Sequence, residues 1–158
     1  MIIRAATPDD LPLMIELDRA SATAAHWSED QYRKLLTPER LVLAASTAAN
    51  SSLTETNRGG KESLVGFLVA RQIAPEWELE NIIVAPFARR KGIGEKLLNA
   101  LIAAARKTNS EVVFLEVRES NDPARALYAR AGFEQTGRRK SYYANPLEDA
   151  VLYRLALH

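Results

Sequence analysis

The chain has 158 residues, a length that fits one ordinary domain with a substantial core. Apolar residues make up 47% and charged residues 26%, and the net charge is +1, so charge alone gives no reason to expect nucleic acid or an acidic membrane surface as a partner. The absence of cysteine excludes disulfides, thiolate metal sites and a cysteine nucleophile, and two histidines, His26 and His158, are too few for a histidine-rich metal site. No apolar run is long enough for a signal peptide or a membrane span, which leads us to expect a cytoplasmic protein.

The first third of the sequence predicts one strand and two helices. Residues 1–6 form a short apolar segment typical of a strand. Thr7, followed by Pro-Asp-Asp, has the cap, the proline and the acidic first turn of a helix start. Ser28 with Gln31 three residues later resembles a capping box and predicts a second short helix that stops before Pro38.

Three strands are expected in the middle of the chain, over residues 41–45, 64–73 and 76–84. The polar segment 46–63 lies between the first two, contains a glycine pair and has almost no large apolar residue, so it predicts an exposed hairpin loop within a single domain. The third strand alternates, and strict alternation places two sets of residues on opposite faces. These sets are Trp77, Leu79 and Asn81 on one face and Glu78, Glu80 and Ile82 on the other.

The last third predicts two helices and three strands. Apolar spacing indicates helices over residues 92–107 and 121–131, while the apolar run 111–117 indicates a strand inside the sheet. Two closing strands are expected near 133–142 and 149–157. The resulting order β-α-α-β-β-β-α-β-α-β-β predicts an α/β (α+β) fold with a mixed sheet covered by helices.

A short basic loop with two glycines, Arg89-Arg90-Lys91-Gly92 and then Gly94, joins a strand to a helix. Free backbone N–H groups at a helix N-terminus form an anion site, and glycines let a pyrophosphate approach the backbone closely. The loop has neither the Gly-Lys-Ser/Thr of a Walker loop nor the third glycine of a dinucleotide fingerprint. The simpler alternative is a glycine-containing turn with a solvated basic run.

The motif Arg89-x-x-Gly92-x-Gly94 resembles the R/Q-x-x-G-x-G/A pyrophosphate loop of the GCN5-related N-acetyltransferases. A second diagnostic block of that family resembles Leu115-Glu116-Val117-Arg118-Glu119-Ser120-Asn121, Ala126-Leu127-Tyr128 and Gly132-Phe133. The resemblance covers residues 2–157. It implies the GNAT fold, a mixed and mostly antiparallel sheet of about seven strands with about four helices. It also implies acetyl-CoA as cofactor, bound by Ile82, Ile83, Val84, Arg89, Arg90, Lys91, Gly92, Ile93, Gly94, Glu95, Asn121 and Tyr128.

Within this superfamily the sequence is most similar to the bacterial ribosomal-protein-alanine N-acetyltransferases. His26-Trp27-Ser28-Glu29 resembles their Pro-Trp-Ser-Glu segment, with His26 in place of proline. Residues 115–120 resemble their LEVRxS segment, and residues 138–143 with 148–150 resemble their RRxxYY…EDA tail. In that family an N-terminal α-amine attacks the thioester directly, which implies a protein N-terminus as acceptor. The sequence itself has no metal-ligand spacing, so no metal is expected.

An acceptor ammonium must lose a proton before it attacks a carbonyl, and a nearby carboxylate can remove that proton. Glu116 is the candidate base: it lies in the apolar strand VVFLEV, and the resemblance places the general base here. Its alternative is an ion pair with Arg118 or another cation. Glu78 and Glu80 are rivals on the preceding strand, and Glu80 stands where the closest family has an apolar residue.

Tyr128 is the candidate acid that protonates the departing thiolate, as the resemblance implies, and its alternative is an aromatic core residue. Asn121 lies seven residues earlier, on the same helix face, and is expected to bind the pantetheine arm, to cap the helix, or both. Trp27, Glu80, Tyr142 and Tyr143 are candidate acceptor-binding residues. For Trp27 and the two tyrosines, core packing is the alternative.

The remaining charged residues receive simpler interpretations. Residues 138–140 are expected to form a solvated run on an edge strand, and His26 to be a surface or cap histidine. The segment 46–63 would cover or reshape one side of the acceptor groove. A small-molecule amine acetyltransferase and a non-catalytic acyl-CoA-binding module remain alternative functions, and the protein is expected to be a monomer or a homodimer without nucleic-acid or membrane partners.

Overall fold

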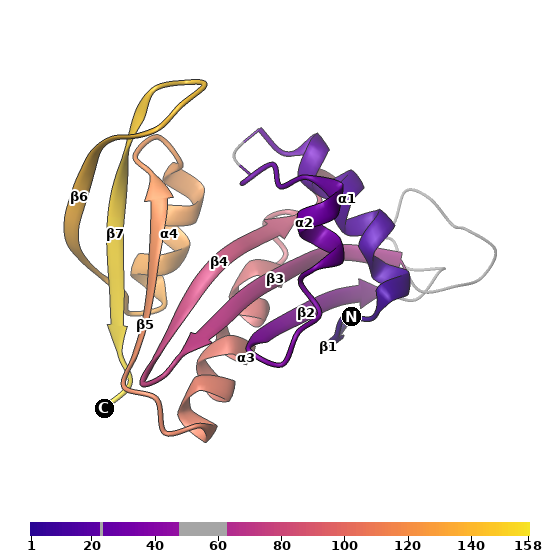
Figure 1. Ribbon diagram of the computed structural model, residues 1–158, viewed down its shortest axis with the longest axis horizontal. Helices are drawn as coiled ribbons and strands as arrows, with labels where there is room; N and C mark the ends of the chain where they lie inside the picture. Colours follow the sequence, from indigo (N-terminus) through magenta and orange to yellow (C-terminus); the bar gives the residue numbers. More distant parts are fainter. Residues whose placement is uncertain (23, 48–62) are drawn as a thin grey trace.

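The computed structural model describes residues 1–22, 24–47 and 63–158, which form one mixed sheet covered by helices on both faces (Figure 1). The sheet has seven strands in the order β1-β2-β3-β4-β5-β7-β6, and β4 with β5 is the parallel pair in an otherwise antiparallel arrangement. The strands are β1 (Ile2–Ala5), β2 (Arg40–Thr47), β3 (Ser63–Ile73), β4 (Glu76–Val84), β5 (Val112–Arg118), β6 (Glu134–Tyr143) and β7 (Glu148–Ala156). The helices are α1 (Leu11–Ala20), α2 (Glu29–Arg33), α3 (Ile93–Lys107) and α4 (Asp122–Arg130), with 3-10 turns at Pro8–Asp10 and Pro86–Ala88. This order confirms the predicted sequence of elements and the predicted fold class.

The two ends of the predicted loop 46–63 belong to strands. Ser46 pairs with Leu64 and Thr47 pairs with Ser63, so the β2–β3 ladder continues past the predicted boundary. Ser46 and Thr47 are also buried, which corrects the prediction that they are exposed. The polar side chains misled the prediction because a sheet can bury small polar residues when the ladder satisfies their backbone groups. The rest of the predicted loop, residues 48–62, lies outside the described residues.

Two apolar cores lie on the two faces of the sheet. The larger core joins α3 and Tyr128 of α4 to β2, β3, β4, β5 and β7. The smaller core joins Met14 of α1 and Tyr32 of α2 to β2, β3 and β4. Each helix thus buries its apolar stripe against one face, as the 3.6-residue spacing predicts. The described helices are too short or too polar to cross a lipid bilayer.

A β-bulge interrupts the alternation of β4. Val69 of β3 lies opposite Asn81, and the next residue, Ala70, lies opposite Leu79. Glu80 is therefore the extra residue on β4. A bulge bends its strand and redirects the side chains that follow it.

Because of the bulge, part of the prediction of which β4 residues share a face of the sheet is wrong. Leu79 packs in the larger core, and Ile82 packs against that same core, although strict alternation places them on opposite faces. Ile83 packs in the smaller core, on the side of α1 and α2. Asn81 lies opposite Val69 of that smaller core, and the prediction that it shares a face with Trp77 and Leu79 is therefore wrong.

Candidate active site

The site begins where β4 and β5 separate. Their parallel pairing ends where Leu79 lies opposite Leu115, although β4 continues to Val84 and β5 continues to Arg118 (Figure 1). The bulge at Glu80 follows this last pair directly. The backbone of β4 beyond Leu79 therefore has no ladder partner on β5 and can form hydrogen bonds with a bound molecule.

A cavity of about 500 Å³ lies where the two strands separate. It brings together residues from β4, β5, α4, the segment before α2 and the β6–β7 hairpin. The predicted site residues that line it are Trp27, Glu78, Glu80, Ile82, Glu116, Asn121, Tyr128, Tyr142 and Tyr143. The predicted cofactor residues that do not line it are Ile83, Val84, Arg89, Arg90, Lys91, Gly92, Ile93, Gly94 and Glu95.

Glu116 faces the cavity with its carboxylate paired to a cation. Arg139 Nε of β6 lies 2.8 Å from Glu116 Oε1. Hydrogen bonding with Glu116, followed by its negative charge, raises the pKa of the Tyr142 hydroxyl. Arg118, the cation named in the sequence-based alternative, instead pairs with Glu148 at 3.3 Å. Glu116 is thus both a cavity carboxylate and a member of an ion pair.

The rival carboxylates differ in their surroundings. Glu80 Oε1 lies 2.9 Å from Arg40 Nε, and both side chains are mostly buried. Glu78 lies 3.8 Å from Arg71, a loose ion pair. Burial, followed by the negative charge of Glu80, raises the pKa of Glu78. Of these two carboxylates, Glu80 is held by a partner and Glu78 is poorly compensated.

Tyr128 combines core packing with access to the cavity. Its side chain is 5% exposed, and its ring lies 5.8 Å from that of Phe133 and 6.0 Å from that of Tyr153. Burial raises its pKa, so the phenol stays protonated at neutral pH. No hydrogen bond joins the Tyr128 hydroxyl to another described residue, which leaves it available on the cavity side.

Asn121 caps α4, as predicted. Its side-chain oxygen accepts a hydrogen bond from the backbone N–H of Ala124 at 3.3 Å. The same residue lines the cavity. The side-chain amide nitrogen is not used by the cap and can donate to a molecule bound there.

Tyr142 and Tyr143 form the wall on the side of the β6–β7 hairpin. Their rings meet edge to face at 5.0 Å, and the Arg118 guanidinium lies 4.4 Å from the centre of the Tyr143 ring. Burial, and then the negative charge of Glu116, raises the pKa of Tyr143 to about 12. Both hydroxyls therefore remain neutral donors at physiological pH.

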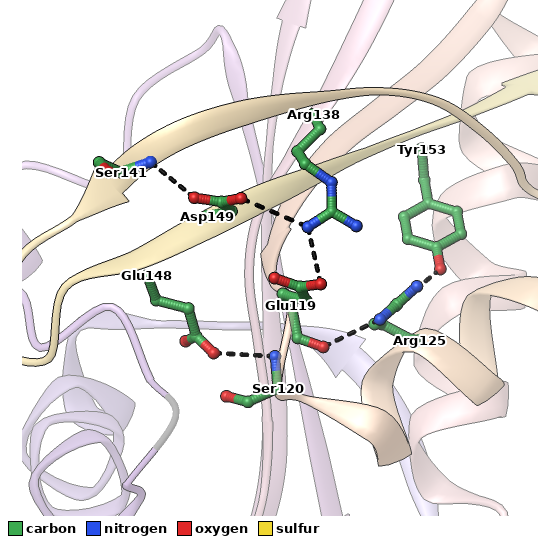
Figure 2. A network of polar contacts seen from close by, with 8 residues as sticks. All are labelled: Glu119, Ser120, Arg125, Arg138, Ser141, Glu148, Asp149 and Tyr153. Atoms are coloured by element: carbon green, nitrogen blue, oxygen red, sulfur yellow. Dashed lines mark hydrogen bonds and ion pairs between the residues drawn. The ribbon is translucent and has the colours of Figure 1, made fainter.

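Two acidic residues at the start of β7 hold this hairpin: Glu148 binds the segment between β5 and α4, and Asp149 binds β6 within the hairpin (Figure 2). The backbone N–H of Ser120 donates to Glu148 at 2.9 Å, and the backbone N–H of Ser141 donates to Asp149 at 2.7 Å. Hydrogen bonds from these serines hold the pKa of both carboxyl groups below their usual range.

Sequence reasoning missed the rest of this network. Arg138 pairs with Glu119 at 2.7 Å and with Asp149 at 3.4 Å, which corrects the prediction that it is only a solvated cation. Arg125 donates to the Glu119 carbonyl at 2.9 Å and to the Tyr153 hydroxyl at 3.1 Å (Figure 2). The similarity of residues 138–150 to a family tail was the one available signal.

The basic loop before α3 has the geometry of an anion site. Gly92 is the N-cap of α3 at φ +76°, and Arg90 also has a left-handed backbone, at φ +62°. Arg89 Nε donates to the Val84 carbonyl at 3.2 Å. Arg89, Arg90 and Lys91 are exposed and form no ion pair with a described residue, so their charges are available to a phosphate group.

The first residues of α3 can offer an anion mainly their backbone N–H groups and not their side chains. The Ile93 side chain is buried in the larger core, so only its backbone N–H can meet a ligand. A Cβ at Gly94 would lie 3.3 Å from Leu127 Cδ2, so this glycine permits close contact between α3 and α4. Glu95 is exposed in the first turn.

The segment before α2 forms the opposite wall of the cavity. Trp27 lines the cavity and also packs against the smaller core, with its ring 5.6 Å from that of Tyr32. Ser28 accepts from the Gln31 backbone at 3.1 Å and donates its own backbone N–H to the Gln31 side chain, which confirms the predicted capping box. His26 is half exposed, as expected of a surface histidine.

Residues 14–133 match the acetyltransferase (GNAT) family. The chain therefore belongs to the GNAT family and is an N-acetyltransferase, which confirms the predicted resemblance. The [ribosomal protein bS18]-alanine N-acetyltransferase of Escherichia coli is 31% identical over 150 residues, covering 94% of this chain and 92% of that protein. The N-alpha-acetyltransferase RimI of Mycobacterium tuberculosis is 43% identical over 79 residues, covering 50% and 48% of the two chains.

Solved structures support the same fold. The crystal structure of the ribosomal-protein-S18-alanine N-acetyltransferase from Escherichia coli has a TM-score of 0.79 at 28% identity, covering 99% of this chain and 93% of that one. Arabidopsis thaliana NAA60 in complex with acetyl-CoA has a TM-score of 0.83 at 18% identity, covering 98% and 97%. At that identity the second likeness shows the fold alone.

Proposed function

We propose that the protein transfers an acetyl group from acetyl-CoA directly to the N-terminal α-amino group of a protein, such as a ribosomal protein. The observation that carries this proposal is the cavity between β4 and β5, which has Glu116 on β5 and Tyr128 on α4 among its lining residues. The similarity to the ribosomal-protein-alanine N-acetyltransferase of Escherichia coli and the N-alpha-acetyltransferase of Mycobacterium tuberculosis supports the N-terminal acceptor.

The basic loop and the free edge of β4 fit coenzyme A. Exposed cations and a left-handed glycine at the start of α3 suit a pyrophosphate. The β4 backbone beyond Leu79 has no partner on the β5 side, and its free groups suit the amides of a pantetheine arm. Residues 89–95 would hold the phosphates, Ile82, Ile83 and Val84 the pantetheine, and Asn121 its distal amide. When bound, acetyl-CoA supplies a thioester whose carbonyl carbon is open to attack by an amine.

Glu116 is proposed to take the proton from the acceptor ammonium, directly or through one water. The acceptor nitrogen then forms the C–N bond while the C–S bond breaks, and the nitrogen releases its second proton to solvent, from which Tyr128 is reprotonated. Tyr128 supplies a proton to the departing sulfur, and a β4 backbone N–H stabilises the negative charge on the carbonyl oxygen. Glu80 is a weaker candidate for the base because its partner Arg40 is mostly buried, whereas Arg139, the partner of Glu116, is exposed and more easily displaced.

The walls of the cavity favour an extended acceptor. Trp27 stands on one wall, and Tyr142 and Tyr143 stand on the other. Trp27 and Glu80 also line a second cavity of about 280 Å³, beside α2. Two adjoining cavities provide more room than a single small amine requires, and aromatic side chains with polar tips suit a peptide backbone.

The test is a panel of acceptors incubated with acetyl-CoA, followed by release of free thiol. The panel contains peptides with free N-termini, the same peptides with blocked N-termini, polyamines and single amino acids. We expect turnover with free N-termini and none with the blocked peptides. Faster turnover with a polyamine or an amino acid would replace the protein acceptor by a small amine, and binding of acetyl-CoA without turnover of any acceptor would contradict catalysis.

A further inference from the structure

A buried carboxylate lies behind the wall formed by residues 24–27. Asp18, near the end of α1, is 1% exposed. Its Oδ2 accepts the backbone N–H of Trp27 at 3.2 Å and the hydroxyl of Tyr32. Its Oδ1 has no hydrogen-bond partner, but His26 Nδ1 lies 3.2 Å away, at ion-pair distance. The proposed chemistry uses none of these contacts.

Burial of a carboxylate is costly unless hydrogen bonds or a cation compensate it. The groups that compensate Asp18 come from α2 and from the wall itself, since His26 and Trp27 both line the cavity. His26 also has a left-handed backbone at φ +54°, a conformation that persists only where its surroundings hold it. The contacts of Asp18 are therefore placed to fix the shape of this wall.

We propose that Asp18 is a positioning residue for the acceptor: it fixes His26 and Trp27 and thereby sets the affinity for the amine substrate without touching it. This inference rests on the proposed function only in that residues 24–27 face the acceptor. Among the described residues, the side chain of Asp18 contacts His26, Trp27 and Tyr32 and not the basic loop before α3, which suits coenzyme A. A loss of Asp18 should therefore weaken acceptor binding and leave the affinity for acetyl-CoA unchanged.

Asp10 provides a matched control. It is also a buried carboxylate, 6% exposed, and Arg4 binds it at 2.7 Å. It lines neither cavity. Removal of Asp10 should therefore lower the stability of the protein by the loss of a buried carboxylate, as removal of Asp18 does, but should leave residues 24–27 in place.

The first measurement is the KM for the acceptor and the Kd for acetyl-CoA in Asp18→Ala, Asp18→Asn and Asp10→Ala. Because hydrogen bonds to charged groups are involved, we expect Asp18→Ala to raise the acceptor KM by at least about tenfold, with the acetyl-CoA Kd unchanged. Asp18→Asn keeps an oxygen acceptor for Trp27 and should give a smaller rise. An unchanged acceptor KM in folded Asp18→Asn and Asp18→Ala, or an equal rise in Asp10→Ala, would overturn the proposal.

A second measurement does not depend on activity. In a Trp77→Phe background Trp27 is the remaining tryptophan. Asp18→Asn should shift its emission to longer wavelength and raise its quenching by acrylamide, because the wall loosens, whereas Asp10→Asn should leave both unchanged. Identical Trp27 spectra would refute the positioning role even if the protein acetylated no tested amine, so this failure is distinct from failure of the proposed function.

Discussion

Arg139 Nε lies 2.8 Å from Glu116 Oε1, so the carboxylate proposed as the base already pairs with a guanidinium, which an acceptor ammonium would have to displace. The two cations compete for one carboxylate. Arg139 is 57% exposed, and exposed ion pairs contribute at most about 1 kcal/mol, or roughly fivefold in binding. We expect Arg139→Gln to lower the acceptor KM by no more than about fivefold, with the difference fading at high salt.

Lys140→Gln is the matched control for this competition. Lys140 lies next to Arg139 on β6 and forms no ion pair with a described residue, so its removal changes the net charge equally. The acceptor KM of Lys140→Gln should stay at the wild-type value. A rise in acceptor KM in Arg139→Gln would mean that Arg139 orients Glu116 and does not compete with the substrate.

Replacement of Glu116 tests the proposed base. Glu116→Gln keeps the size of the side chain but cannot take a proton, so kcat should fall by about 10²- to 10⁴-fold. The affinity for acetyl-CoA, measured by calorimetry, should not change because the basic loop is intact. Wild-type kcat in Glu116→Gln, together with a collapse of kcat in Glu78→Gln, would move the role to β4.

The ionisation of Glu78 should make the stability of the protein depend on pH. Burial raises its pKa in the folded protein above the value in the unfolded chain. The folded state then binds more protons between the two values, so the free energy of unfolding falls as the pH rises through that window. Glu78→Gln should remove this fall and unfold at higher urea concentration than wild type at neutral pH. Parallel stability curves for the two proteins across pH would contradict the assignment.

The elements could be predicted because their signals are local. The apolar spacing of α3 and the capping box at Ser28 depend on residues within a few positions of one another. The bulge at Glu80 could not be predicted, because it arises from the register of β4 against β3, and the residue types before it, Trp77 to Glu80, alternate regularly in the sequence. For this reason the prediction that Asn81 shares a face with Trp77 and Leu79 was wrong.

In the candidate site, too, the local motifs could be predicted from the sequence and the contacts between distant segments could not. The basic loop and Asn121 were predicted because a cap and a glycine-opened helix are short motifs. The partners of Glu116 were not, since Arg139 reaches it from β6, a strand that β7 separates from β5 in the sheet. Contacts across several strands require the topology, which periodicity alone does not provide.

The left-handed backbone of Gly92 gives a test of the anion site. A Cβ at this position would meet no atom within 4 Å, so Gly92→Ala strains the backbone at φ +76° without crowding the protein. We expect weaker binding of acetyl-CoA by calorimetry, because the N–H groups at the start of α3 lose their alignment. Gly132→Ala, at φ +96° beyond α4, imposes similar strain away from the loop and should cost stability alone. Equal affinities in both variants would exclude the loop as the phosphate site.

The ties that hold the β6–β7 hairpin should weaken in acid. Hydrogen bonds from Ser120 lower the pKa of Glu148 in the folded protein, so its contribution to stability is complete above the usual glutamate pKa and is lost as the pH falls through the lowered value. Glu148→Gln should therefore be less stable than wild type to urea at neutral pH, with the difference closing at about pH 3. Glu134→Gln, on the exposed edge of the same hairpin, serves as the control and should match wild type throughout. A deficit in Glu148→Gln that stays constant with pH would show that the lost contact is not the ionised carboxylate.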